Sequence, residues 1–282
     1  WATPEVLFQH QTRAAWATEL FTGGERPCIF VHTFDTASHY LELKTFQSFT
    51  DDAGKHWSDP ISVPGGLNSV CMRQGIVLHN GDWVFPVYWQ EVYRAGGWDF
   101  QKSDGPQFND SWRFCCGALR SADQGKSFSL HGNLHAATSL WEPNIVEIAP
   151  HQLVMLIRAE GTPCKYRSDS HDGGKTWSHP HPTDIPDANS KITLLTHGND
   201  VIMLHNPSTV PGWNNRTTLA LWLSHDGCQT WPTKIDLVSS QAEGRVICYP
   251  HAFIDEDAQR LYIAVDAVDK HYFFTMPLSD LA

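Results

Sequence analysis

The chain has 282 residues, of which 12% are aromatic and 18% are charged, and its formal net charge is −11. Such an acidic chain lacks the basic surface that nucleic-acid binding requires, so we expect no nucleic-acid partner. No apolar run approaches the roughly 18 residues that a membrane-spanning helix needs, so we predict no membrane span. Because no change of composition marks a boundary, we expect a single domain over residues 1–282.

The first residue and the cysteines bear on location and on metal binding. The chain begins at Trp1 rather than at Met, so either a leader has been removed or the sequence has been trimmed, and we expect a secreted or periplasmic protein. There are seven cysteines, of which Cys115 and Cys116 are adjacent, and none has the spacing of a zinc site. We therefore predict no metal, no cofactor and no complete set of disulfides.

Short runs of Val, Ile, Leu, Phe and Trp recur along the chain between clusters of Gly, Pro, Asp and Asn, and this pattern predicts an all-β fold. Four stretches loosely fit Ser/Thr-x-Asp-x-Gly-x-Thr-Trp, and we name them the Asp turns. In such a turn the Asp accepts hydrogen bonds from amides, the Gly permits a positive φ and the final aromatic residue packs between sheets. The Asp turns are residues 50–57, 121–128, 170–177 and 224–231, with Cys228 at the usual Gly position in the last.

The Asp turns divide the chain into modules of about 50 residues, and about four short strands per module are typical of a β-propeller. The second module carries a long insertion, residues 94–110, and the fifth module shows only three strands and no Asp turn. We predict that residues 6–9 supply the missing fourth strand. The modules are residues 13–63, 69–130, 141–183, 190–237 and 246–277.

The Asp turns resemble the Asp-boxes of the sialidases (neuraminidases), and the resemblance extends to residues on which catalysis in that family depends. Glu142, in Glu-Pro-Asn-Ile-Val-Glu-Ile, resembles the glutamate that polarises a tyrosine nucleophile, and Tyr249, in Cys-Tyr-Pro-His, resembles that nucleophile. Arg13, Arg158 and Arg216 resemble the arginine triad that binds the substrate carboxylate. The resemblance implies a propeller fold and an acidic sugar as substrate.

Two features depart from the family pattern. Sialidases of this type have six blades, whereas we count five modules, so a six-bladed propeller is the alternative to a five-bladed one. The family also carries an aspartate acid/base on a loop of the first blade. Here that loop is residues 34–40, so either Asp35 or His39 supplies the acid or the acid is absent. The second departure leaves the reaction type open.

The residues of the predicted site indicate the charge of the ligand independently of the resemblance to sialidases. The three arginines, Glu142 and Tyr249 all fall at ends of predicted inner strands. Converging arginines repel one another until an anion neutralises them, and guanidinium groups bind carboxylates in charge-assisted, often bidentate pairs. We therefore expect an acidic carbohydrate. Glu142 would draw the proton from Tyr249 and so let the phenol react.

Three function classes remain open. The first, which we favour, is a retaining exo-glycosidase that releases sialic acid or a related 2-keto acid sugar, with Tyr249 as nucleophile and Asp35 or His39 as acid. The second is a polysaccharide lyase, in which Tyr249 or His39 removes the proton next to a uronic acid carboxylate. The third is a non-catalytic carbohydrate-binding propeller, which is least favoured because both Glu142 and Tyr249 are present.

Overall fold

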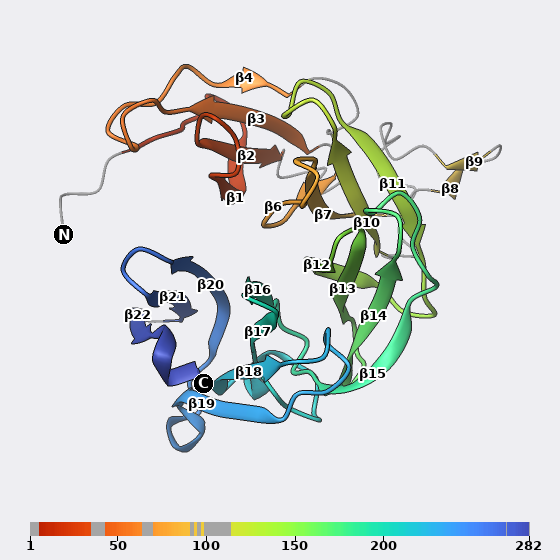
Figure 1. The fold of residues 1–282 in the computed structure, drawn as a ribbon, viewed down its shortest axis with the longest axis vertical. Coiled ribbons are helices and arrows are strands. Elements are labelled where there is room, and N and C mark those ends of the chain that lie inside the picture. The colour runs from red at the N-terminus through yellow and green to blue at the C-terminus, as the bar shows by residue number, and fades with distance from the viewer. Residues whose placement is uncertain are drawn as a thin grey trace. The chain divides into compact units, whose positions relative to one another are not determined.

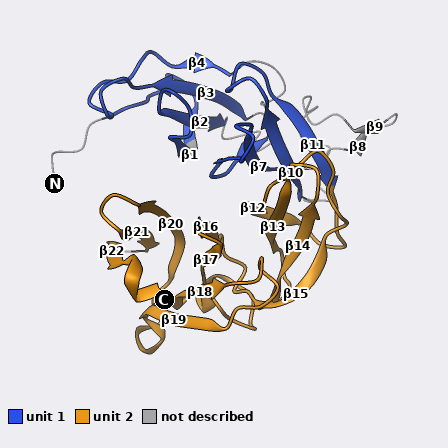
Figure 2. Ribbon diagram, viewed as in Figure 1, with its two compact units in different colours: residues 1–133 blue, residues 134–282 orange. Residues whose placement is uncertain are grey.

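The computed structural model consists of short antiparallel strands joined by turns, and its only helices within the described residues are single turns (Figure 1). It describes residues 6–34, 43–63, 70–90, 93–94, 97–98, 114–268 and 270–281. The chain divides into two compact units, residues 1–133 and 134–282 (Figure 2). We describe each unit by itself, and the expected single domain over residues 1–282 stays a prediction.

The described residues of unit 1 form two antiparallel sheets and a small hairpin. The first sheet has the strand order β1-β2-β3-β4, and the second has the order β11-β10-β7-β5, with β6 also paired to β7. The hairpin β8-β9 begins at the start of the predicted insertion. The strands are β1 Ala14–Phe21, β2 Cys28–Phe34, β3 Lys44–Phe49, β4 Ile61–Ser62, β5 Cys71–Met72, β6 Ile76–Val77, β7 Trp83–Gln90, β8 Tyr93–Arg94, β9 Gly97–Trp98, β10 Phe114–Ser121 and β11 Ser129–Leu134.

Unit 2 contains three antiparallel sheets, which follow the third, fourth and fifth predicted modules. We name them the third sheet (β12-β13-β14-β15), the fourth sheet (β16-β17-β18-β19) and the fifth sheet (β20-β21-β22). Their elements are β12 Leu140–Ala149, β13 Gln152–Ala159, β14 Cys164–Ser170, β15 His181–Pro186, β16 Thr193–His197, β17 Asp200–His205, η2 Trp213–Asn215, β18 Thr218–Ser224, β19 Thr233–Ser239, η3 Gln241–Glu243, β20 Ile247–Asp255, β21 Arg260–Ala267, β22 Lys270–Pro277 and η4 Leu278–Leu281.

The core of unit 2 lies between neighbouring sheets. Val154 and Leu156 of β13 pack with Met203 and Trp222 of the fourth sheet, whose other face packs against the fifth sheet through Leu221. Strands covered on both faces read as almost continuous apolar runs. Burying each such side chain contributes about 1.5–3 kcal/mol to folding, so apolar contacts between the faces of neighbouring sheets stabilise unit 2.

The Asp turns share one hydrogen-bond pattern. In every turn the Asp Oδ1 accepts the backbone N–H four residues on, at 2.8–2.9 Å, in the pairs Asp52–His56, Asp123–Ser127, Asp172–Thr176 and Asp226–Thr230. The fifth position of each turn has a positive φ, which glycine adopts without strain. Cys228 adopts it in the last turn, at φ 65°.

The fourth Asp turn differs in its tryptophan. In the third turn Trp177 Nε1 donates to Gly174 O at 3.0 Å, and the first turn has the equivalent bond. In the fourth turn the carbonyl of Cys228 instead accepts Nη1 of Arg167, from β14, at 2.5 Å. Trp231 Nε1 has no hydrogen-bond partner among the described residues. Arg167 therefore ties the third sheet to the fourth Asp turn.

The prediction for residues 6–9 is wrong. They form no strand, and the fifth sheet has three strands in the described part of the chain. The ring of Phe8 lies 5.6 Å from that of Phe46 on β3, while Val6 and Leu7 are exposed. An apolar run of this kind indicates β propensity but does not select a partner strand, and Phe8 finds apolar contact within its own unit.

Two findings concern the cysteines and the membrane. All seven cysteines lie within the described residues and are free thiols, as expected for a chain without a disulfide framework. No helix in the described ranges has the length and apolar character needed to cross a membrane.

The carboxyl groups of the four Asp turns have a pKa of about 2 in the folded protein. In three of them the main cause is hydrogen bonds from the residue four positions on. At Asp172 slight burial raises the pKa, and the bonds from Thr176 outweigh it. A depressed pKa means that the ionised form stabilises the fold above the ordinary value near 4, and that this stability is lost as the pH falls toward 2.

We therefore predict that Asp172→Asn lowers the melting temperature at pH 7 and makes its further fall between about pH 4 and pH 2 shallower than in the wild type. Thermal unfolding followed by circular dichroism over this range measures both effects. Asp257→Asn, in the exposed turn between β20 and β21, is the control and should do neither. Parallel pH profiles for Asp172→Asn and the wild type would contradict the prediction.

Candidate functional site

Four of the predicted site residues lie in unit 2, close to the ends of strands. Glu142 is near the start of β12 and Arg158 near the end of β13, and these strands pair so that Arg158 lies opposite Trp141. Arg216 follows the helical turn η2, and Tyr249 lies near the start of β20. The antiparallel pairing of β12 and β13 brings the carboxylate and the guanidinium together.

Glu142 and Tyr249 have strained backbones. Their φ angles are 43° and 55°, although neither residue is glycine. Each lies at a bulge, where the strand register shifts between Trp141 and Asn144 and between Cys248 and His251. The left-handed conformation costs a non-glycine residue about 1–2 kcal/mol, and bulges redirect side chains. Strain of this kind persists where the surroundings fix it and is frequent at functional sites.

Arg158 is a largely buried cation held by two carboxylates. Its Nη1 lies 3.0 Å from Glu142 Oε2 and its Nη2 lies 2.9 Å from Glu160 Oε2. The guanidinium also lies over the ring of Trp141, 5.5 Å from its centroid. Burial lowers the pKa of Arg158, but Glu142, Glu160 and Tyr249 together raise it above its usual value. Arg158 is therefore charged at every ordinary pH.

Arg216 donates directly to the candidate nucleophile. Its Nη1 lies 3.1 Å from the phenolic oxygen of Tyr249, and its Nη2 donates to the carbonyl of Asn189. Its guanidinium lies 4.9 Å from the ring centroid of Trp213, which is 48% exposed. A guanidinium that donates to the phenolic oxygen fixes its position and can stabilise negative charge that develops on it during a reaction.

The two pairs, Glu142 with Arg158 and Tyr249 with Arg216, belong to one electrostatic cluster. Tyr249 contributes to the raised pKa of Arg158. Burial raises the pKa of Cys248 to about 11, and both Arg216 and Glu142 act on the same thiol. The cluster thus combines two cations, a carboxylate and a phenol, which can bind an anion and move a proton beside it.

The other three predicted site residues belong to residues 1–133, which form unit 1. Arg13 belongs to unit 1, where its Nε donates to Thr33 Oγ1 at 3.0 Å and its Nη2 donates to Thr33 O at 3.1 Å. Asp35 and His39 lie outside the described residues. The roles of all three stay predictions.

The buried polar residues next to the two arginines are not predicted from the sequence. Lys165 Nζ lies 2.7 Å from Asp187 Oδ1, and neither side chain is exposed. Asn189, two residues after Asp187, accepts the hydrogen bond from Arg216. Lys165, Arg167 and Asp169 alternate along β14, which is the pattern of a solvated strand face, so the sequence held no signal that Lys165 is buried.

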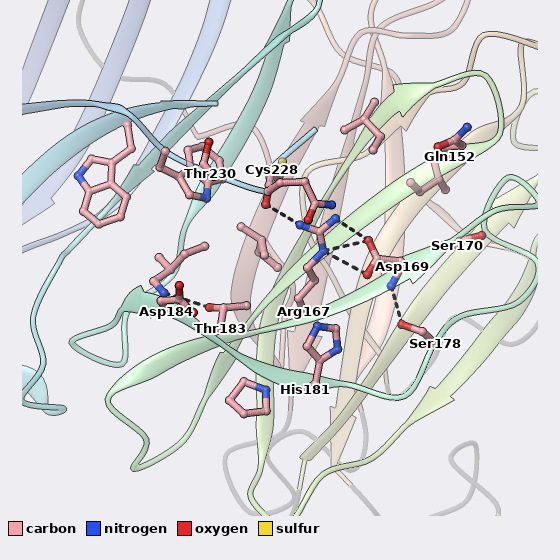
Figure 3. A pocket seen from close by; sticks show the side chains of 18 of the residues that line it. Gln152, Arg167, Asp169, Ser170, Ser178, His181, Thr183, Asp184, Cys228 and Thr230 are labelled. Atoms are coloured by element: carbon pink, nitrogen blue, oxygen red, sulfur yellow. Dashed lines mark hydrogen bonds and ion pairs between the residues drawn. The ribbon is translucent and has the colours of Figure 1, made fainter. Parts of the chain in front are cut away.

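A cavity of about 860 Å³ lies elsewhere in unit 2, between the third and fourth sheets. Ile148 and Gln152, at the hairpin between β12 and β13, line it, so it is at the ends of these strands remote from Glu142 and Arg158. Figure 3 shows that Arg167 contacts Asp169 and the carbonyl of Cys228 there. Arg167 is satisfied by its own neighbours, and Lys234, which also lines the cavity, has its Nζ 3.9 Å from the ring centroid of Trp222.

Comparison with known proteins places the fold. Residues 1–263 match the BNR repeat-like domain family. A sialidase of Bacteroides fragilis is 26% identical over 255 residues, which are 83% of this chain and 42% of that protein. The chain therefore spans less than half the length of this curated relative.

Three solved structures share the fold at low identity. The Hadza microbial sialidase Hz136 has a TM-score of 0.73 and 16% identity, over 95% of this chain and 53% of that one. Trypanosoma rangeli sialidase in complex with the inhibitor DANA has a TM-score of 0.65 and 16% identity, over 95% of this chain and 46% of that one. A protein of unknown function from Dyadobacter fermentans has a TM-score of 0.68 and 13% identity, over 97% of this chain and 78% of that one.

These matches confirm the predicted fold class, an all-β β-propeller, and the predicted resemblance. Within the described residues five blade-type sheets, two in unit 1 and three in unit 2, correspond to the five predicted modules rather than to six. The chain therefore belongs to the BNR repeat-like domain family and has the β-propeller fold of the sialidases.

Proposed function

We propose that the protein is a sialidase-like glycoside hydrolase that releases a terminal sialic acid, or a related 2-keto acid sugar, from an acidic carbohydrate. The observation that carries the proposal is the pairing of each reactive group with an arginine, Arg158 with Glu142 and Arg216 with Tyr249. The curated relative and the solved structures named as sialidases support the same reading. A secreted or periplasmic location is part of the proposal.

The arginines bind the substrate carboxylate. Arg158 and Arg216 are largely withdrawn from water, and a guanidinium in such surroundings binds a carboxylate more strongly than it does in bulk solvent. Arg13 is the third member of this group in the proposal. Fixing the carboxylate also fixes the neighbouring anomeric carbon, because the two are directly bonded in a 2-keto acid sugar.

The reaction proceeds through a tyrosyl sugar. The oxygen of Tyr249 forms a bond to the anomeric carbon while the glycosidic bond breaks, and Glu142 accepts the phenolic proton. The leaving oxygen takes a proton from Asp35 or His39. Water then attacks the same carbon and gives a proton to Asp35 or His39, while Tyr249 leaves and regains its proton from Glu142. A neutral phenol suits an anionic substrate because a carboxylate nucleophile would be repelled by it.

A polysaccharide lyase is the second candidate, and the hydrogen bond from Arg216 to Tyr249 also favours it. The phenolic oxygen that accepts this bond would give its own proton to Glu142 and remove the proton next to a uronic acid carboxylate. The arginines would then neutralise the carboxylate as the adjacent carbon loses its proton. The two reactions differ in their products, since only the lyase creates a carbon–carbon double bond.

We predict that Arg158→Ala or Arg216→Ala lowers kcat/KM for a sialyl aryl glycoside. The loss should correspond to about 2–5 kcal/mol of transition-state stabilisation, because each substitution removes a partner of the desolvated substrate carboxylate. Methyl esterification of the substrate carboxylate should lower kcat/KM of the wild type by a similar amount. It should lower kcat/KM of either variant much less. Arg167→Ala is the control, since it removes a buried, ion-paired arginine outside the cluster. Equal hydrolysis of the ester and the free acid by the wild type would exclude the clamp.

We predict that Tyr249→Phe abolishes most turnover while binding of sialic acid survives, because the ring and both arginines remain. A 2,3-difluoro sialic acid should leave a covalent adduct on Tyr249 of the wild type, visible by mass spectrometry of peptides. Tyr262→Phe is the control, because Tyr262 stacks between Phe253 and Phe273 on the fifth sheet.

Three experimental results would change the proposed assignment of the reaction. An unsaturated uronate product without any adduct would establish the lyase instead. Full activity in Tyr249→Phe would exclude both reactions as written. Binding of sialic acid without turnover of either substrate class would leave a carbohydrate-binding propeller.

A further inference from the structure

We propose that Asn189 is a positioning residue that sets the spacing between Arg158 and Arg216, and thereby shapes the carboxylate site. The inference rests on the proposed function for the identity of the ligand, although the geometry that carries it involves the protein alone. Asn189 lies on the segment between β15 and β16, so it belongs neither to β13, which carries Arg158, nor to the segment between η2 and β18, which carries Arg216.

The side chain of Asn189 holds the turn that follows Arg158. Its Oδ1 accepts the N–H of Gly161 at 2.7 Å, and its Nδ2 donates to the carbonyls of Ala159 and Thr162, both at 3.0 Å. Ala159 is the residue directly after Arg158 and is the last of β13. Three hydrogen bonds thus fix the backbone from which Arg158 projects.

The main chain of Asn189 holds Arg216. Its carbonyl accepts Nη2 of Arg216, whose Nη1 donates to Tyr249 at 3.1 Å. The direction of this carbonyl depends on a φ of 56°, in the left-handed region that asparagine tolerates better than most residues. One residue therefore contacts the backbone beside one arginine and the guanidinium of the other.

The segment that carries Asn189 is anchored on both sides. Asp187 lies 2.7 Å from the Nζ of the fully buried Lys165, and its Oδ1 also accepts the N–H of Ser190 at 3.1 Å. Lys165 Nζ donates to the carbonyl of Ser190 as well. The backbone N–H of Asp187 donates to Pro163 O at 3.0 Å. Asn189 is thus held between two residues, Asp187 and Ser190, that are tied to β14.

This arrangement matters because a carboxylate bound by two guanidinium groups demands a defined separation between them. Displacement of a binding group by about 1 Å can cost a reaction on the order of a hundredfold. Arg158 comes from the third sheet, and Arg216 comes from the segment that leads into β18 of the fourth sheet. Asn189 links the two places, because its side chain bonds the backbone beside Arg158 and its carbonyl accepts from Arg216. Loss of the Asn189 side chain should therefore alter recognition of the carboxylate more than it alters the fold.

The principal variant is Asn189→Gly, which keeps the carbonyl and the left-handed conformation but removes all three side-chain hydrogen bonds. Asn189→Asp is the second variant, in case the first does not fold, because it keeps the acceptor for Gly161 and cannot donate to Ala159 or Thr162. Ser168→Ala is the matched control: it removes the buried bond from Ser168 Oγ to Ser178 O, 2.7 Å long, on the same strand as Lys165.

The kinetic readout is kcat/KM for a sialyl aryl glycoside and for its methyl ester. We expect Asn189→Gly to lower the value for the free acid about tenfold or more and to leave the ester nearly unchanged, so that the preference for the acid falls. Ser168→Ala should leave the preference as it is. A loss of equal size on acid and ester in Asn189→Gly would show a merely structural role and overturn the proposal.

Crystal structures of the wild type and Asn189→Gly give a readout that needs no substrate. We expect the separation of the Cζ atoms of Arg158 and Arg216 to change and the bond from Arg216 to Tyr249 to lengthen. Unchanged arginine positions would overturn the proposal. If the wild type neither binds nor cleaves a sialoside, the proposed function fails, and these two structures still decide the role of Asn189.

Discussion

Two arginine side chains, Arg158 and Arg216, are withdrawn from water in unit 2, and the surrounding polar groups are arranged to offset the cost of that burial. A buried charge is tolerated only when it is paired and hydrogen-bonded. Glu142 and Glu160 pair with Arg158, whereas the carbonyl of Asn189 and the oxygen of Tyr249 accept hydrogen bonds from Arg216. The Nε of each arginine has no hydrogen-bond partner among the described residues. The groups that stabilise the buried arginines therefore include Glu142 and Tyr249, the two groups that we propose take part in the reaction.

The same requirement explains two local departures from regular strands. Glu142 and Tyr249 lie at bulges with positive φ, which turn their side chains away from the alternation of an ideal strand. The energy lost in these conformations is small beside the burial of the sheets that carry them. A propeller blade can therefore hold strained residues at strand ends while its apolar faces keep the fold.

The sequence sufficed to predict the repeated sheets because the Asp turns encode local hydrogen bonds. An Asp followed four residues later by a donor forms the same turn wherever it occurs, and all four predicted turns have it. It also sufficed to place Glu142 and Arg158 at strand ends, whereas the ion pair between them is a finding of the structure, in which β12 and β13 bring these ends together. Residues 6–9 were misassigned because strand propensity does not encode a partner.

The residues behind the site could not be predicted for a different reason. Lys165 alternates with Arg167 and Asp169 in a pattern typical of a solvated face, and burial comes only from the packing of the third sheet. Asn189 lies in a stretch of small and polar residues that indicates an ordinary loop. Its importance arises from contacts with residues 27 and 30 positions away in the chain, which local patterns do not contain.

The most direct test of the central claim is a crystal structure of the protein with DANA, the inhibitor bound in the Trypanosoma rangeli structure. The arrangement of the cluster predicts that the carboxylate of the inhibitor lies within hydrogen-bond distance of Arg158 and Arg216, with its ring beside Tyr249. A carboxylate that contacts neither arginine, or an inhibitor bound only in the cavity beside Arg167, would contradict the claim.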